Sequence, residues 1–147
     1  MQIRKARFSD CKLYWNWAND PTVRANAFET QPIPWQTHIA WFKEKLDDHN
    51  STLLLLENES EPIGQIRFDH TTDGYFIDFS ISTTYRNRGL GILLVSSGIN
   101  HFKFTQQITF WGEVKQSNKA STKIFEKLGF EKVPPQKRRT ILYRLEV

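Results

Sequence analysis

The sequence predicts one α/β domain over residues 1–147, of the mixed α+β kind, in which a central sheet of about seven strands is flanked by about four helices. Two observations lead to this prediction. The 147 residues are 39% hydrophobic and 24% charged, which is the balance of a soluble globular chain that can bury a single core. Hydrophobic periodicity then places the elements in the order β, α, α, β, β, β, α, β, α, β, β along the chain.

The first part of the chain predicts a strand and a short helix. The strand covers residues 2–8, and Ser9 or Asp10 is a suitable N-cap for the helix that follows. Pro21 disfavours helical geometry in the residue before it, so we expect the helix to end there. Residues 23–34 predict an irregular connection because they contain two further prolines.

A second helix and three strands come next. Pro34 suits the first turn of the helix, whose apolar stripe is made of Trp35, Ile39, Phe42 and Leu46. Residues 51–57 contain four consecutive leucines and predict a buried strand. Ile66 and Phe68 alternate with polar residues on the next strand, and residues 71–74 form a turn signal before the third.

Residues 77–98 combine a strand, a glycine-containing turn and a helix. Ile77 to Ile81 alternate with polar residues, and two arginines and two glycines then lie within residues 86–91. A helix start leaves about four N–H groups without intrahelical partners, and these groups favour an anion such as phosphate. Gly89 and Gly91 would let the backbone approach the anion, and Arg86 and Arg88 would add mobile positive charge at the rim. The alternative is an ordinary strand-to-helix turn with surface arginines.

The C-terminal part predicts a strand, a helix and two further strands. Residues 108–114 form the first strand, and Ser117 or Asn118 can cap the helix. The inward face of that helix is expected to contain Ala120, Ile124 and Leu128. Gly129 is placed to end the helix, and residues 130–133 and 140–147 predict the last two strands.

Composition limits the partners. The net charge of +4 is partly concentrated in residues 137–139, and no broad basic stripe with interleaved aromatic residues indicates nucleic-acid binding. The single cysteine, Cys11, excludes an internal disulfide and fits a cytoplasmic protein, and no apolar run reaches the ~18 residues of a membrane span. His49, His70 and His101 lack partners at metal-ligand spacing, so we expect no metal. The sequence leaves open whether the protein forms a homodimer.

Four landmarks together resemble the GNAT superfamily of N-acetyltransferases. Residues 86–91 resemble its R/Q-x-x-G-x-G/A pyrophosphate loop, and the strand that ends at Ile81 precedes the loop as in that superfamily. Glu113 and Asn118 follow in register, and residues 125–130 are similar to its Y-x-K-x-G-F segment. Residues 17–42 are similar to two narrower groups within the superfamily. These are the ribosomal-protein N-terminal acetyltransferases and the nucleotide amino-sugar acetyltransferases of pseudaminic-acid and related pathways.

The resemblance implies acetyl-CoA as the cofactor and assigns residues to it. The expected cofactor-binding residues are Ile81, Ser82, Arg86, Asn87, Arg88, Gly89, Leu90, Gly91, Ile92, Asn118, Ser121 and Phe125. The main chain at Ile81 would bind the pantetheine arm as an added strand would, and Asn118 would face the thioester end or act only as a helix cap. Phe125 stands where the family often has a tyrosine that protonates the leaving thiolate. Tyr85 or a water molecule would then supply the proton, or the thiolate would leave unprotonated.

The acceptor amine must lose a proton before it attacks, because amines are mostly protonated at neutral pH. Glu113 is the leading candidate base, and an ordinary carboxylate paired with Lys115 is the alternative. His38 is the second candidate, against a packed or surface histidine. Arg24, His38 and Thr83 are the expected substrate-binding residues, with Arg24 as a phosphate or carboxylate clamp rather than a catalyst. The five tryptophans pack mostly in the core, and one or two could line an acceptor pocket.

The sequence therefore predicts an acetyl-CoA-dependent N-acetyltransferase in which a primary amine attacks the thioester directly. The favoured acceptor is a nucleotide-linked amino sugar, which makes the main partner a small-molecule amine. A protein N-terminal acetyltransferase and a non-catalytic acetyl-CoA-binding domain are the alternatives.

Overall fold

The computed structural model describes residues 1–102 and 106–147 and contains a seven-stranded sheet with the strand order β1-β2-β3-β4-β5-β7-β6. The strands are β1 (Gln2–Lys5), β2 (Ser51–Asn58), β3 (Glu61–Thr71), β4 (Gly74–Ile81), β5 (Thr109–Lys115), β6 (Glu131–Val133) and β7 (Thr140–Glu146). The α-helices are α1 (Cys11–Ala18), α2 (Pro21–Asn26), α3 (Trp35–Asp47), α4 (Leu90–His101) and α5 (Lys119–Lys127). Two 3₁₀ turns, η1 (Phe8–Asp10) and η2 (Thr83–Tyr85), complete the described elements. The predicted fold class and mixed sheet are confirmed.

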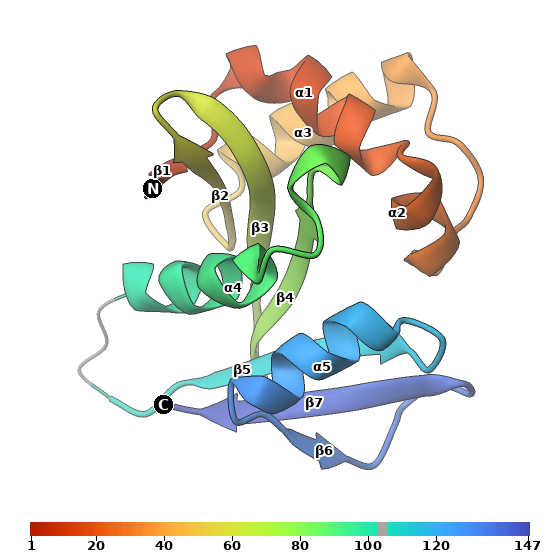
Figure 1. Ribbon diagram of the computed structural model, residues 1–147, viewed down its shortest axis with the longest axis vertical. Helices are drawn as coiled ribbons and strands as arrows, with labels where there is room; N and C mark the ends of the chain where they lie inside the picture. The colour runs from red at the N-terminus through yellow and green to blue at the C-terminus, as the bar shows by residue number, and fades with distance from the viewer. Residues whose placement is uncertain (103–105) are drawn as a thin grey trace.

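The sheet opens between its two central strands. Neighbouring strands are antiparallel except for β4 and β5, which run parallel. This parallel pair has two register positions, Tyr75 with Phe110 and Phe76 with Trp111. In Figure 1, β5 and β7 run across the direction of β2, β3 and β4, so that the two halves of the sheet diverge. The residues of β4 after Phe76 therefore have a free edge toward β5.

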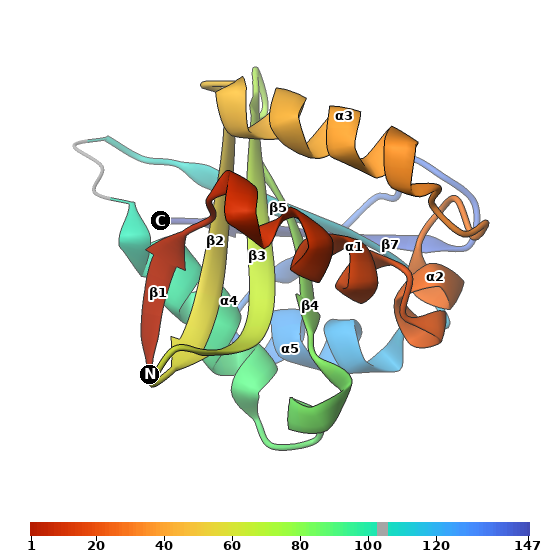
Figure 2. The same ribbon diagram turned by 90° about the horizontal axis from the view of Figure 1, so that it is seen from above.

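Helices cover the two faces of the sheet separately. Helices α1 and α3 lie on one face of the N-terminal strands, and α4 and α5 lie on the other side (Figures 1 and 2). The four leucines of β2 serve both layers: Leu53 and Leu55 pack under α1 and α3, and Leu54 and Leu56 belong to the larger core with α4. The leucine run is thus a strand buried on both faces, as the sequence predicts.

Three sequence expectations are corrected. Residues 21–26, expected to be mostly irregular, form the additional helix α2 because the Asp20 carboxylate accepts hydrogen bonds from two N–H groups of its first turn. The first strand ends at Lys5, since Phe8–Asp10 turn back as η1. In α5 the residue buried completely is Phe125, whereas Ala120 is exposed.

None of the helices described here has both the length and the apolar character needed to cross a membrane. Within the same described residues, no group of three or more histidine, cysteine or acidic side chains could hold a metal ion.

Candidate active site

A cavity of about 1020 Å³ lies at the divergence of β4 and β5 and extends to both layers of helices. Most of the residues expected to form the site line it, namely Arg24, His38, Ile81, Tyr85, Arg86, Asn87, Gly89, Leu90, Gly91, Ile92, Glu113, Asn118, Ser121 and Phe125. Ser82, Thr83 and Arg88 are not among its lining residues. The topology thus brings together residues that are up to about a hundred positions apart in sequence.

The glycine-containing turn forms an open anion cradle at the start of α4. Gly89 is the N-cap in the left-handed conformation, with φ 73°, and Asn87 has φ 62°. A Cβ atom added at Gly89 would meet nothing within 4 Å, so the space in front of the turn is open. The first N–H groups of α4 have no helical partners, and no backbone acceptor among the described residues meets the N–H of Asn87, Arg88 or Gly89. These groups fit a diphosphate.

The two arginines of this loop, Arg86 and Arg88, are not the mobile charges at the rim that the sequence predicted. Arg86 donates from Nε to the carbonyl of Ile81 at 3.0 Å and from Nη2 to the Asp20 carboxylate at 3.0 Å. Its side chain therefore fixes the loop to the start of α2. Arg88 lies over the ring of Tyr85, with its Cζ 5.4 Å from the ring centroid, outside the cavity lining.

Thr83 and Ser82 also have structural partners. The hydroxyl of Thr83 donates to Asp20 Oδ2 at 2.8 Å, so that Asp20 holds both η2 and the glycine loop. The N–H of Ser82 donates to the carbonyl of Ile63 at 2.8 Å, on the β3 side of the strand. The edge available to an added strand is therefore the side of β4 that faces β5.

Asn118 is a helix cap that also lines the cavity. Its Oδ1 accepts a hydrogen bond from the Ser121 N–H at 3.2 Å, and both residues line the cavity where α5 begins. The cap and a contact with a bound molecule are compatible, because the amide NH₂ of Asn118 is not used by the cap.

Phe125 is a buried packing residue rather than a proton donor. Its ring is fully buried against Phe79, Phe130 and Tyr143. The hydroxyl of Tyr143 donates to Glu126 at 2.6 Å, and burial together with this carboxylate raises the pKa of Tyr143 to about 12. Tyr85 lines the cavity, and the Glu61 carboxylate together with partial desolvation raises the pKa of its phenol. Tyr85 thus carries its proton at neutral pH.

Glu113 lines the cavity and has one carboxylate oxygen without a partner among the described residues. Its Oε1 pairs with Lys137 Nζ at 3.2 Å, and its Oε2 is buried without a hydrogen-bond partner among the described residues. The expected pairing with Lys115 is wrong, because the Lys115 ammonium donates to the carbonyl of Ala25 at 3.0 Å. Since Glu113 lines the cavity and an unpaired buried carboxylate oxygen is a strong hydrogen-bond acceptor, Oε2 is suited to receive a proton.

His38 is buried on α3 with 2% of its surface exposed. Its Nε2 lies 2.8 Å from the carbonyl oxygen of Cys11, and because a carbonyl can only accept, the proton is on Nε2 and the lone pair on Nδ1. Burial lowers the pKa of His38, and the hydrogen bond to Cys11 opposes this only in part. A neutral imidazole, packed among the rings of Trp35, Trp41 and Phe42, thus forms part of the cavity wall.

Arg24 organises the α2 to α3 connection. Its Nε donates to the Ala18 carbonyl at 2.6 Å, and its Nη1 donates to the carbonyls of Glu29 and Gln31 at 2.8 and 3.3 Å. Because Nη2 has no partner among the described residues, only this end of the guanidinium remains for a ligand in the cavity.

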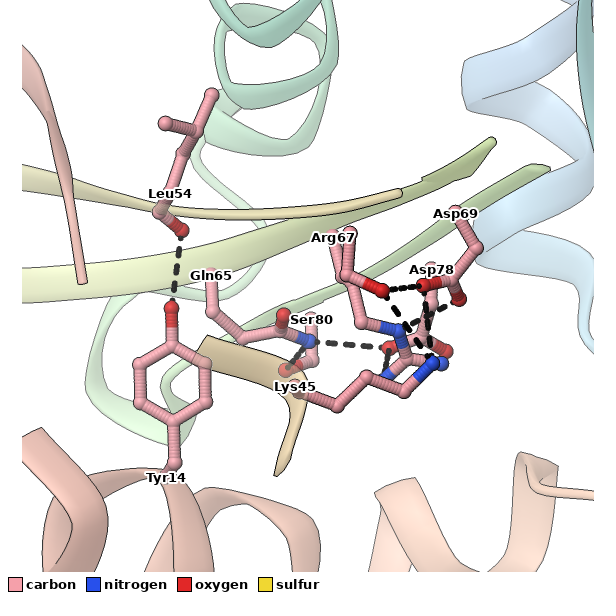
Figure 3. A network of polar contacts seen from close by, with 9 residues as sticks. Tyr14, Lys45, Leu54, Gln65, Arg67, Asp69, Asp78 and Ser80 are labelled. Atoms are coloured by element: carbon pink, nitrogen blue, oxygen red, sulfur yellow. Dashed lines mark hydrogen bonds and ion pairs between the residues drawn. The ribbon is translucent and has the colours of Figure 1, made fainter. Parts of the chain in front are cut away.

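The sequence interpretation missed a polar network on the cavity wall. Gln65 and Arg67 on β3 and Asp78 and Ser80 on β4 all line the cavity on the side of α1 and α3, and Figure 3 shows them with Tyr14 and Lys45. The signal was present as polar residues at every second position of two neighbouring strands. Half-buried strands usually expose such residues to water, so the pattern did not indicate a site.

An open sheet with an anion cradle and a free strand edge is suited to hold an extended cofactor that contains a diphosphate, such as acetyl-CoA. The model of the acetyltransferase (GNAT) domain matches residues 1–131, so the chain belongs to the GNAT acetyltransferase family. The glycine loop and the free edge of β4 fit this cofactor, which supplies the acetyl group as an activated thioester.

Known proteins share the fold over nearly the whole chain. A domain from Methanocaldococcus jannaschii is 21% identical, with a TM-score of 0.86 over 99% of this chain and 97% of that one. Spermidine N-acetyltransferase from Vibrio cholerae, solved with CoA and spermine, is 14% identical, with a TM-score of 0.82 over 99% and 94%. Ribosomal-protein-alanine N-acetyltransferase from Brucella melitensis is 15% identical, with a TM-score of 0.80 over 100% of both chains.

A curated relative is also similar along the whole chain. The uncharacterized protein MJ1062 of Methanocaldococcus jannaschii is 22% identical over 149 residues, which cover 99% of this chain. The chain spans only 31% of the length of that relative.

Proposed function

We propose that residues 1–147 act as one acetyltransferase domain that acetylates the primary amine of a nucleotide-linked amino sugar. The observation that carries this proposal is the aromatic wall of the cavity on the side opposite the glycine loop. Tyr14 and Trp17 of α1, Trp41 of α3 and Phe28 of the α2 to α3 connection line it. Flat rings suit a sugar or base ring, and the free Nη2 of Arg24 suits a phosphate oxygen.

The residues present can carry out the proton transfers. Glu113 Oε2 accepts the proton that the acceptor ammonium must lose, directly or through water, and His38 Nδ1 is the alternative acceptor. As the C–N bond replaces the C–S bond, the nitrogen would lose its second proton, and Tyr85 or a water molecule would pass one proton to the sulfur so that coenzyme A leaves as the thiol. Phe125 has no proton to donate.

A second candidate is acetylation of a protein N-terminus. It is favoured by Glu113, which matches the base-bearing glutamate of the ribosomal-protein enzymes that the chain resembles. A peptide acceptor needs an open groove, however, whereas aromatic side chains of α1, α3 and the α2 to α3 connection line one wall of this cavity. A non-catalytic acetyl-CoA-binding domain is the third candidate, because Phe125 replaces the usual tyrosine.

The test is thiol release from acetyl-CoA with three acceptors in parallel: a UDP-linked 4-amino sugar, a peptide with a free N-terminus, and spermidine. We expect release with the amino sugar at low concentration and little with the other two. Release with the peptide alone would support the second candidate, and release with spermidine alone would refute both. Tight acetyl-CoA binding without release would support the third.

Two further properties belong to this proposal. The proposed location is the cytoplasm, which a single free cysteine and the use of acetyl-CoA support. The partners proposed are small molecules, and light scattering of the purified chain would decide between a monomer and a homodimer.

A further inference from the structure

Four polar side chains form one continuous surface inside the cavity, on the face of the sheet toward α1 and α3. Gln65 lies opposite Ser80, and Arg67 lies opposite Asp78, in the antiparallel register of β3 and β4. Gln65 Nε2 donates to Asp78 Oδ2 at 3.3 Å and to Ser80 Oγ at 3.2 Å (Figure 3). The amide group thus holds the carboxylate and the hydroxyl at a fixed separation.

These groups keep unused hydrogen-bonding capacity. The Asp78 side chain is 57% exposed, although it lines the cavity. Its Oδ1 and the Gln65 Oε1 have no partner among the described residues, and the Ser80 hydroxyl can donate as well as accept. Two acceptors and one donor that converge in this way match hydroxyl groups, which both donate and accept.

The electrostatic balance argues against a polycation as the occupant. Arg67 donates to Asp69 at 2.9 Å and lies 3.8 Å from Asp78, and Lys45 donates to Asp69 at 3.1 Å. Two cations therefore face two carboxylates, which leaves no excess negative charge for a polyamine. A neutral hydroxylated ring needs hydrogen bonds rather than net charge, and the aromatic rings of Trp17 and Trp41 line the same cavity.

This polar surface lies beside Glu113, the candidate base, in the sheet. The last paired position of β4 and β5 joins Phe76 to Trp111. Asp78 and Glu113 are each two residues further along, and because strand side chains alternate with period two, both lie on the same face. They flank the opening between the strands from its two sides.

We propose that Gln65, Asp78 and Ser80 form a subsite that binds ring hydroxyl groups of the acceptor and holds its amine toward Glu113. This inference rests on the proposed function and adds which residues distinguish a hydroxylated ring from a polyamine.

The test compares two six-membered-ring amines, glucosamine, which carries hydroxyl groups and a hydroxymethyl group, and cyclohexylamine, which has no oxygen atoms. We measure kcat/KM for both in the wild type, in Asp78→Ala and Asp78→Asn, and in the matched control Asp73→Asn, which changes an exposed carboxylate of the same hairpin outside this cavity. We expect the wild-type preference for glucosamine to fall about tenfold or more in Asp78→Ala, since a hydrogen-bonding partner is lost. The value for cyclohexylamine and the KM for acetyl-CoA should stay unchanged, as should all values of the control.

Binding of the two amines is followed in parallel by tryptophan fluorescence, because Trp17 and Trp41 line the cavity, so a chain without turnover still gives a result. An equal loss for both amines, or no loss in Asp78→Ala, would overturn the subsite. Thermal melting of Asp78→Asn, which keeps the shape of the side chain, separates misfolding from loss of recognition. Failure of the proposed function is recognised separately, by the absence of transfer to the UDP-linked amino sugar in the wild type.

Discussion

Replacement of Gly112 by alanine is expected to separate α5 from the sheet. An added Cβ would lie 2.3 Å from Phe125 Cζ and 2.7 and 2.8 Å from its two Cε atoms. The Phe125 ring is fully buried, with the ring centroids of Phe130 and Tyr143 at 4.9 and 5.4 Å, so it has no space into which to move. The helix itself must therefore shift, and it carries Asn118 at its N-cap.

The cost can be worked out from these contacts. Overpacking a core by one methyl group costs about 1–3 kcal/mol, and contact with three ring atoms below 3.0 Å places Gly112→Ala near the upper value. Replacing a strand glycine returns about 0.5–1 kcal/mol of chain entropy. The net loss is about 2 kcal/mol, which corresponds to a fall in Tm of roughly 4–8 °C for a chain of this size.

Urea unfolding of the wild type, Gly112→Ala and Gly91→Ala measures this loss. Gly91→Ala is the control, because its Cβ would meet the mobile end of Ile124, Cδ1 at 2.4 Å, and a helix gains about 1 kcal/mol from alanine. The double variant Gly112→Ala/Phe125→Leu should regain part of the stability. Wild-type stability in Gly112→Ala, or no recovery in the double variant, would refute the packing argument.

Three other predictions concern the site and its support. Glu113→Gln should lower kcat about 100-fold or more with the acetyl-CoA Kd from calorimetry unchanged, because only the proton acceptor is removed; an unchanged kcat would exclude Glu113 as the base. Lys137→Met should lower kcat about tenfold and Lys137→Arg should restore it, because Lys137 acts by holding Oε1 of Glu113. In the Glu113→Gln variant, neither Lys137 substitution should change kcat further. Burial alone would raise the pKa of Asp10, but the hydrogen bonds from Arg4 and the Arg7 N–H outweigh it and lower that pKa below 3.8. The stability from this pair is therefore present above pH ~4 and lost as the pH falls further. Acid unfolding of Asp10→Asn should show a smaller loss of stability below pH ~4 than the wild type; an identical pH dependence would contradict the assignment.

Local patterns were sufficient to predict the sheet and the glycine loop, because both depend on neighbouring residues. The alternation around Phe79 and the φ of Gly89 are properties of a few consecutive positions. Helix α2 was missed although its signal is local: Asp20 before Pro21 ends one helix and also supplies the N-cap and first residue of the next. Asp20 and Pro21 are consistent both with the end of one helix and with the start of the next, and the structure shows that both occur here.

The roles of the charged side chains could not be predicted, because their partners are distant in sequence and are often backbone carbonyls. Arg86 is held by Asp20, 66 residues away, and Arg24 is held by the carbonyl of Ala18 at the end of α1 and by that of Glu29 in the loop before α3. The partner of Glu113 is Lys137, from the connection between β6 and β7, rather than the nearby Lys115. Such contacts arise from the way segments pack, which composition and spacing do not record.

Strand β4 explains how one short element can serve two substrates. Its odd positions, Ile77 and Phe79, contact the core with α4 and α5, and its even positions, Asp78 and Ser80, point into the other layer. Where pairing with β5 stops at Phe76, the backbone edge also becomes free. In the proposed function, the edge would hold a cofactor arm while the polar face would hold the acceptor, and the same register would fix both. A shift of β4 by one residue would exchange the two faces, so in the proposed function the contact of Phe79 with Phe125 would also fix the place of the acceptor.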